Sequence, residues 1–135
     1  MLHPNQFQVS EAWIAFKLNE SVIHTEMDGD FNLFALMDAA SCYLMSTTTV
    51  SAKAAEPSRL ESRRLLKDAQ ATKNRLPITL FIPTLQAANF LTTEAERQGI
   101  QVIRVPEDQL LIFIGDAREG FRERFGGAND GDDGH

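Results

Sequence analysis

Three side chains near the start of the chain are candidates for acid–base chemistry. Asp38 directly follows an apolar run, and Glu20 and His24 lie in the polar segment before it. If the fold brought the three together in a cleft, they would form a dispersed acidic site able to transfer protons. The alternative for Asp38 is structural, because an acid after a strand often bonds the amides of the next turn, here near Ser41. We favour this turn-capping role.

The metal-binding patterns in the sequence are incomplete. The segment Asp28-Gly29-Asp30-Phe31-Asn32 opens like a calcium loop, but Leu33 and Ala39 stand where such a loop needs glycine and glutamate. His24 and Glu26 would share one face of a strand, but two ligands do not make a zinc site. We therefore expect neither a metal nor another cofactor.

The single cysteine, Cys42, has no neighbouring base in the sequence that would activate it as a nucleophile. A free cysteine is usually a small buried apolar residue, and we expect that role for Cys42. The sequence also lacks glycine-rich phosphate loops and a nucleophile elbow. Because no reactive constellation is complete, the sequence favours a protein that is not an enzyme.

A basic segment from Ser58 to Leu76 is the clearest binding signal. It holds six basic residues and two acids, in a chain whose net charge is −6. Arg59, Arg63 and Lys67 are spaced by four residues and share one face of the expected helix. Such a stripe binds phosphates or an acidic partner, or else it is only a solvated helix face. No aromatic residue interleaves with it, which weakens a single-stranded nucleic-acid interpretation.

The first half of the chain is expected to supply antiparallel strands. Residues 12–18 and Leu33 to Met37 have the composition of strands, and Val22 to Thr25 would form a short strand in a hairpin with the first. Tyr43 to Ser51 predicts a further strand with the hydroxyls of residues 46–49 on its solvent face. Short loops join these strands, so neighbours should run in opposite directions.

Helices alternate with strands in the second half of the chain. Ser58-x-x-Glu61 has the spacing of a capping box at a helix start, and Gly115 could break the last helix. We expect helices at 58–76, 84–98 and 107–125, with strands at 78–82 and 100–105. The complete order predicts an α/β (α+β) fold with a mixed sheet, in which antiparallel strands precede an α-β-α-β-α succession.

Length and composition indicate one domain. The chain has 135 residues, of which 43% are hydrophobic and 24% are charged. We expect a single domain at residues 1–125 and a disordered acidic tail at 126–135, which is rich in glycine and aspartate. The first residues lack a secretory pattern, and no apolar run approaches the roughly 18 residues that a membrane span needs. A cytoplasmic protein without membrane contact is the resulting expectation.

One stretch carries a family resemblance. The run Asn32-Leu33-Phe34-Ala35-Leu36-Met37-Asp38-Ala39-Ala40-Ser41, followed by a strand from Cys42, resembles the integrase and transposase branch of the ribonuclease H-like fold. The strand Ile78 to Ile82 and the phrase Glu96-Arg97-Gln98-Gly99-Ile100 resemble the next part of the core in that family. The resemblance spans about residues 12–125 and implies a ribonuclease H-like plan. As a small protein of this kind, the chain also resembles the products of mobile gene cassettes.

The departures from that family concern its metal site. The family cuts or joins phosphodiesters with two metal ions, held by carboxylates in the first strand and at the end of the fourth. Here Asn19 and Thr84 stand where the resemblance implies acids. Because Mg²⁺ requires hard oxygen ligands, the resemblance implies the scaffold without its metal site.

The leading functional interpretation is a non-catalytic protein-interaction or binding module on a degenerate ribonuclease H-like scaffold. Its partner would be another protein or a second copy, since a threonine-rich edge strand offers a surface for strand pairing. Two alternatives stay open. One is nucleic-acid binding through helix 58–76, with Arg59, Arg63 and Lys67 as contacts; the other is an enzyme with a dispersed acidic site near Asp38.

Overall fold

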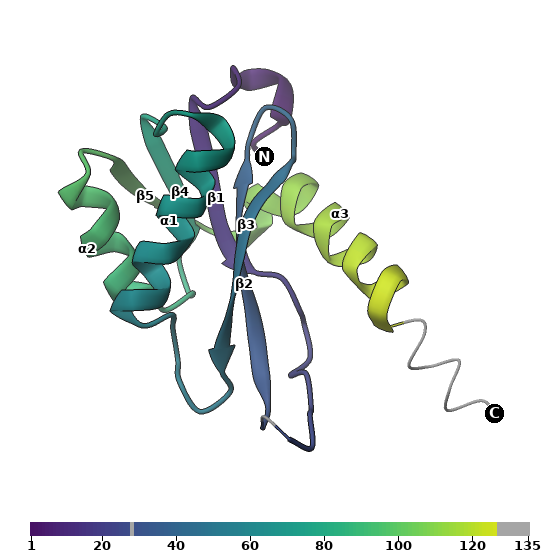
Figure 1. The fold of residues 1–135 in the computed structure, drawn as a ribbon. Coiled ribbons are helices and arrows are strands. Elements are labelled where there is room, and N and C mark those ends of the chain that lie inside the picture. Colours follow the sequence, from purple (N-terminus) through teal and green to yellow (C-terminus); the bar gives the residue numbers. More distant parts are fainter. Residues whose placement is uncertain (28, 127–135) are drawn as a thin grey trace.

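Five strands form one mixed sheet in the computed structural model, which describes residues 1–27 and 29–126 (Figure 1). The order is β3-β2-β1-β4-β5. The strands are β1 (Ala12–Lys17), β2 (Phe31–Asp38), β3 (Leu44–Ser51), β4 (Thr79–Pro83) and β5 (Gln101–Val105). β2 lies between β1 and β3 and is antiparallel to both. β4 lies between β1 and β5 and is parallel to both. The expected mixed α/β class is confirmed, and this arrangement agrees with a ribonuclease H-like plan.

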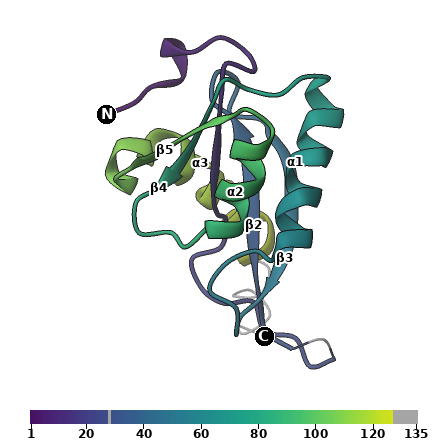
Figure 2. The ribbon, with the colours of Figure 1, turned by 90° about the vertical axis from the view of Figure 1, so that its left-hand side faces the viewer.

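Helices cover both faces of the sheet (Figures 1 and 2). α1 (Arg59–Lys73) and α2 (Asn89–Arg97) pack on one face, and α3 (Leu111–Phe121) packs on the other. Three short helical turns complete the described chain: η1 (Pro4–Gln6), η2 (Glu107–Leu110) and the π-helical turn η3 (Arg122–Gly126). The sheet therefore separates two apolar cores.

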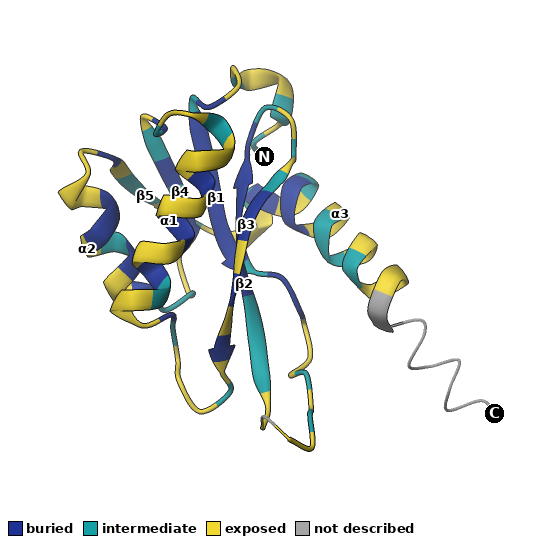
Figure 3. Cartoon of the chain, viewed as in Figure 1, coloured by how far each residue is buried: buried dark blue, intermediate teal, exposed yellow. Residues whose placement is uncertain are grey.

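The central strand β1 belongs to both cores. Trp13 and Ala15 face the α1 and α2 side, and Ile14 and Phe16 face α3. All four are fully buried, and Figure 3 shows the strand dark blue along most of its length. A strand covered on both faces needs a continuous apolar sequence, as in parallel sheets, and this is why residues 12–18 lack polar alternation.

Helix α1 begins as expected. The Ser58 hydroxyl accepts a hydrogen bond from the Glu61 backbone N–H at 3.1 Å, and the Glu61 carboxylate accepts one from the Ser58 N–H at 2.8 Å. This reciprocal capping box satisfies two of the free amides at the helix start. At the other end Asn74, in the left-handed conformation with φ 61°, closes the helix before Pro77.

The expected hairpin strand from Val22 to Thr25 is wrong. Only Ile23 bridges to Phe31, and the surrounding residues are irregular. The reason is the buried amide of Asn19, which donates to the Ser21 carbonyl and accepts from the Leu33 N–H. These bonds fix a turn directly after β1 and leave no straight strand beside it.

Two helix boundaries also differ from expectation. α2 begins at Asn89 rather than near Thr84, because residues 84–88 form a turn in which the Thr84 N–H donates to the Val105 carbonyl. The last helical segment is not broken at Gly115, which lies inside α3. Of the expected tail at 126–135, only the backbone of Gly126 is described, and it belongs to η3. Residues 127–135 and the side chain of Phe125 lie outside the described residues.

The threonine-rich strand β3 alternates between its faces. Ser46 and Thr48 are buried, whereas Thr47 and Thr49 are exposed. The expectation that all four hydroxyls face solvent is therefore wrong, because α1 covers one face of the strand and the Ser46 hydroxyl donates to the Leu65 carbonyl of α1. No helix in residues 1–27 and 29–126 is long and apolar enough to cross a membrane.

Candidate functional site

Asp38 is a buried turn cap. One carboxylate oxygen accepts a hydrogen bond from the Ser10 N–H at 2.7 Å. The other oxygen accepts from the Ser41 N–H at 3.1 Å and from the Ser41 hydroxyl at 2.8 Å. With no exposed surface and three donors, the side chain has the structural role favoured by its position after a strand.

The three acid–base candidates do not meet. Asp38 pairs in register with Trp13 near the start of β1, whereas Glu20 follows the end of β1. The strand between Trp13 and Lys17 alone separates them by about 13 Å. Glu20 forms an ion pair with Arg122, and the exposed His24 Nδ1 lies 3.0 Å from the Asp30 carboxylate. Of the three, only Glu20 lines the cavity at the carboxyl ends of β1, β4 and β5, so the fold gives no support to the dispersed acidic site.

A cavity of about 620 Å³ lies at the carboxyl ends of β1, β4 and β5. This edge of an open α/β sheet is where ligands commonly bind. Its polar lining comprises Lys17, Glu20, Thr84, Gln86, Glu107, Asp108 and Arg118. Thr84 lines this cavity, whereas Asn19 does not, and the charged side chains of the lining determine which ligands the cavity could bind.

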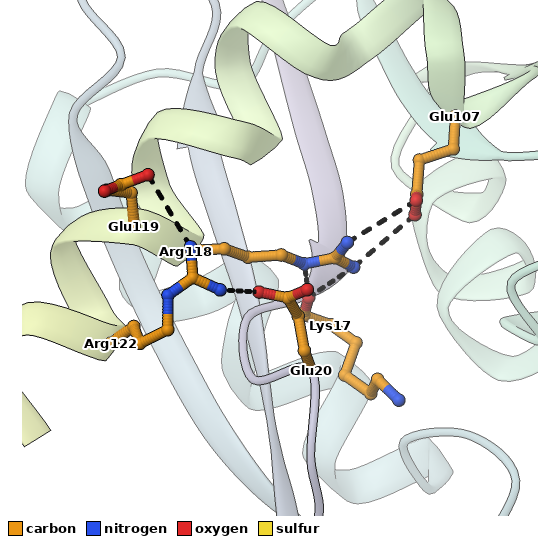
Figure 4. Close-up of polar contacts among 6 residues, drawn as sticks. All are labelled: Lys17, Glu20, Glu107, Arg118, Glu119 and Arg122. Carbon is orange, nitrogen blue, oxygen red and sulfur yellow. Dashed lines mark hydrogen bonds and ion pairs between the residues drawn. The ribbon is translucent and has the colours of Figure 1, made fainter. Parts of the chain in front are cut away.

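Arginines from the α3 side occupy this edge (Figure 4). The Arg118 guanidinium donates twice to the Lys17 carbonyl, at 3.0 and 2.9 Å, and contacts the Glu107 carboxylate at 3.4 Å. Arg122 pairs with Glu20. Two of the three acids are thus neutralised by arginine. The Lys17 ammonium points away from both arginines and has no ion pair within the described chain.

The donor set at this edge does not fit a pair of magnesium ions. The Asn19 oxygen already accepts the Leu33 N–H at 2.7 Å, and its nitrogen donates to the Asn32 side chain at 2.8 Å. Thr84 offers only a neutral hydroxyl. Among the residues described, no three histidine, cysteine, aspartate or glutamate side chains lie close enough to hold a metal ion. No step through a bound metal follows from these residues.

Cys42 occupies a strained turn without an activating base. Its φ of 59° lies in the left-handed region, and its N–H donates to the Asp38 carbonyl. Burial raises the pKa of the thiol, and the negative charges of Asp116 and Asp38 raise it further. The thiol therefore stays protonated at neutral pH, which is the opposite of what a nucleophile needs.

Two of the three basic residues proposed as a binding stripe on α1 contact residues of α2. Arg59, Arg63 and Lys67 are all exposed. However, the Arg59 guanidinium carbon lies 5.8 Å from the centre of the Phe90 ring, and Arg63 lies 3.5 Å from the Glu94 carboxylate. Both contacts join α1 to α2. Sequence reasoning missed Glu94, because only the packing of two helices brings it to Arg63.

The free edge of β3 exposes backbone groups in a defined pattern. The Leu18 N–H donates to the Leu33 carbonyl, so Leu33 directs its backbone toward β1. Leu33 pairs in register with Thr49, which is consequently in a non-hydrogen-bonded pair with β2. The N–H and carbonyl of Thr49 therefore point away from the sheet, and alternation gives Thr47 and Ser51 the same orientation. The Ser51 carbonyl accepts a hydrogen bond from the Ala54 N–H at 2.9 Å.

Helix α1 covers only the first part of this edge. Met37 pairs with Leu44 and Leu36 pairs with Ser46, which leaves Met45 as the extra residue of a bulge. The Met45 carbonyl accepts a hydrogen bond from the Thr72 hydroxyl of α1 at 3.4 Å. The edge beyond this contact, from Thr47 to Ser51, has exposed side chains at alternate positions.

Comparisons with known proteins give a distant structural match and no sequence relative. No protein family model and no curated protein matches the chain. Among solved structures, the chain is similar to one in the cryo-electron microscopy structure of a simian T-cell lymphotropic virus intasome in complex with the PP2A regulatory subunit B56 gamma. The TM-score is 0.47 and the sequence identity is 12%. The match covers 93% of this chain and 44% of that chain, so this chain spans less than half the length of its neighbour.

Proposed function

We propose that the protein is a non-catalytic interaction module that pairs with a second copy of itself through the edge of β3. The observation that carries the proposal is the open edge at Thr47 and Thr49, whose N–H and carbonyl groups point outward from the sheet. The Ser51 N–H also points outward, whereas the Ser51 carbonyl accepts the Ala54 N–H at 2.9 Å. Such groups pair readily with an added strand, a common mode of protein recognition.

The contrast between the two sheet edges supports β3 as the interface. The other edge strand, β5, has only five residues and carries Arg104, which donates to the Pro83 and Gln86 carbonyls. Short length and charge are ordinary ways to blunt an edge. β3 has eight residues and neither a charge nor a proline. The long edge thus lacks the features that prevent pairing.

A second copy suits this edge better than a charged partner. An antiparallel pairing centred on Thr49 would place Thr49 opposite its own copy and Thr47 opposite Ser51. The same surface would serve both subunits, as two-fold symmetry requires. Threonine and serine side chains form favourable cross-strand pairs, and no like charges would oppose one another.

The carboxyl edge of the sheet supports a non-catalytic role. Arg118 and Arg122 neutralise Glu107 and Glu20 there, and the buried Asp38 is bonded to Ser10 and Ser41 elsewhere. Asp108 is the one acid of the cavity lining without an arginine partner among the described residues, and one carboxylate does not form an acid–base pair. The proposal therefore assigns the exposed strand edge, rather than the cavity, to the function.

Replacing Thr49 with proline tests the interface. The substitution removes one outward N–H without removing a bond to β2, a position where an edge strand tolerates proline. Sedimentation velocity at micromolar concentrations should show dimers for the wild type and for the control Thr49→Ala, but monomers for Thr49→Pro. A monomeric wild type, or a Thr49→Pro variant that dimerises like the control, would contradict the proposal.

A further inference from the structure

A buried acid lies between two arginines where α1 meets α2. The Glu94 side chain is 3% exposed, and its Oε1 lies 3.5 Å from Arg63 Nη2 and 3.4 Å from Arg97 Nη1. Neither contact has the geometry of a hydrogen bond, so this oxygen is a buried acceptor without a donor among the described residues. Glu94 therefore attracts both arginines electrostatically, and its Oε1 accepts no hydrogen bond from their N–H groups.

The charge at this junction is unbalanced in favour of the arginines. Two guanidinium groups face one carboxylate, which leaves a local charge of +1. The Arg63 and Arg97 side chains are 53% and 61% exposed, whereas Glu94 is covered by protein. Each guanidinium has five donors in a fixed plane, so several donors per arginine remain directed toward solvent.

We propose that Arg63 and Arg97 together bind one phosphate group, with Glu94 as the residue that positions both guanidinium groups. A phosphate has enough acceptor oxygens for two arginines to share, and the planar guanidinium matches its geometry. A single group is favoured over an extended polyanion because the local charge is only +1 and the whole chain carries −6. The site does not depend on the β3 edge.

Glu94 distinguishes this site from a merely basic surface. If charge alone attracted the anion, removing the carboxylate in Glu94→Gln would strengthen binding. If Glu94 positions the arginines, its removal frees two long side chains that must then be ordered by the ligand. That ordering should weaken binding about tenfold. The two explanations therefore predict opposite signs for one substitution.

The test is a titration of the full chain with inorganic phosphate at constant ionic strength, observed through the arginine Nε–Hε signals by NMR. The proposal predicts saturable shifts for Arg63 and Arg97 and weaker binding by Glu94→Gln. Arg97→Lys, which keeps the charge and loses the planar fork, should also bind more weakly. The matched control Arg64→Lys, on the exposed face of α1, should bind like the wild type.

Several outcomes would overturn the proposal. They are shifts that do not saturate, equal or tighter binding by Glu94→Gln, and identical affinities for Arg97→Lys and Arg64→Lys. Should Glu94→Gln fail to fold, the two lysine variants still decide. A parallel titration with a short DNA oligonucleotide separates the sources of phosphate, because tight binding that survives Arg97→Lys would assign the surface to nucleic acid instead.

Discussion

At the scale of single residues, Asp38 shows how a polar side chain can organise a sheet. It connects Ser10, which precedes β1, with Ser41 in the turn after β2. The two segments are distant in sequence and adjacent in space. Hydrogen bonds to a buried carboxylate are stronger than neutral ones, and donors left without it would remain buried and unpaired.

Replacing Asp38 with alanine should therefore be costly. We expect Asp38→Ala to lower the free energy of unfolding by about 3 kcal/mol, because the buried Ser10 N–H loses its acceptor. The exposed Asp108, at the edge of the cavity, provides the control. Asp108→Ala should change stability by no more than about 0.5 kcal/mol. Urea unfolding measures both, and equal midpoints would refute the structural role of Asp38.

At the scale of elements, α3 is fastened to the end of β1. Arg118 reaches from α3 to the Lys17 carbonyl at the last residue of that strand, and also contacts Glu107 at the start of η2. Only 17% of the Arg118 side chain is exposed. A largely buried guanidinium that satisfies a backbone carbonyl should contribute more than a surface ion pair.

Two arginines at the end of the chain's last helical segment allow a matched comparison. Arg118→Met should lower the free energy of unfolding by about 2 kcal/mol, since it removes both side-chain donors from the Lys17 carbonyl. Arg122→Met removes only the exposed pairs with Glu20 and Glu119 and should cost less than about 1 kcal/mol. Thermal or urea unfolding of both variants provides the measurement. A larger loss for Arg122→Met would mean that α3 is not held in this way.

The elements also show what the sequence could predict. The capping box at Ser58 and Glu61 and the apolar strands are local signals, because all of their partners lie within one turn or one strand. The start of α2 is not local. The Phe90 N–H donates to the Glu56 carboxylate at 2.9 Å, and Glu56 precedes α1. A helix start fixed by a residue 34 positions away cannot be located from local spacing.

The same limit applies to the candidate sites. Spacing alone puts Arg59, Arg63 and Lys67 on one face of α1, and the structure has them exposed there. Spacing could not indicate that Glu94 and Phe90 of α2 engage two of them. The hairpin expected at Val22 failed for a similar reason, since the buried Asn19 side chain bonds Leu33 across the turn.

At the scale of the whole molecule, the protein is a sheet with helices packed on both faces and two unequal edges. α1 and α2 pack on one face, α3 packs on the other, and Arg104 lies on the short edge strand β5. The edge of β3 beyond Met45 is left with outward backbone groups and uncharged side chains. We expect such a protein to associate through the edge of β3, which lacks the features that prevent strand pairing.

Amide hydrogen exchange of β3 at two protein concentrations tests this expectation most directly. The amides of Ser46, Thr48 and Val50 face β2 and should exchange slowly at both concentrations. The amides of Thr47, Thr49 and Ser51 should exchange rapidly in dilute solution and become protected as concentration rises. Rapid exchange of these three amides in a sample that is already dimeric would show that the chain associates through another surface.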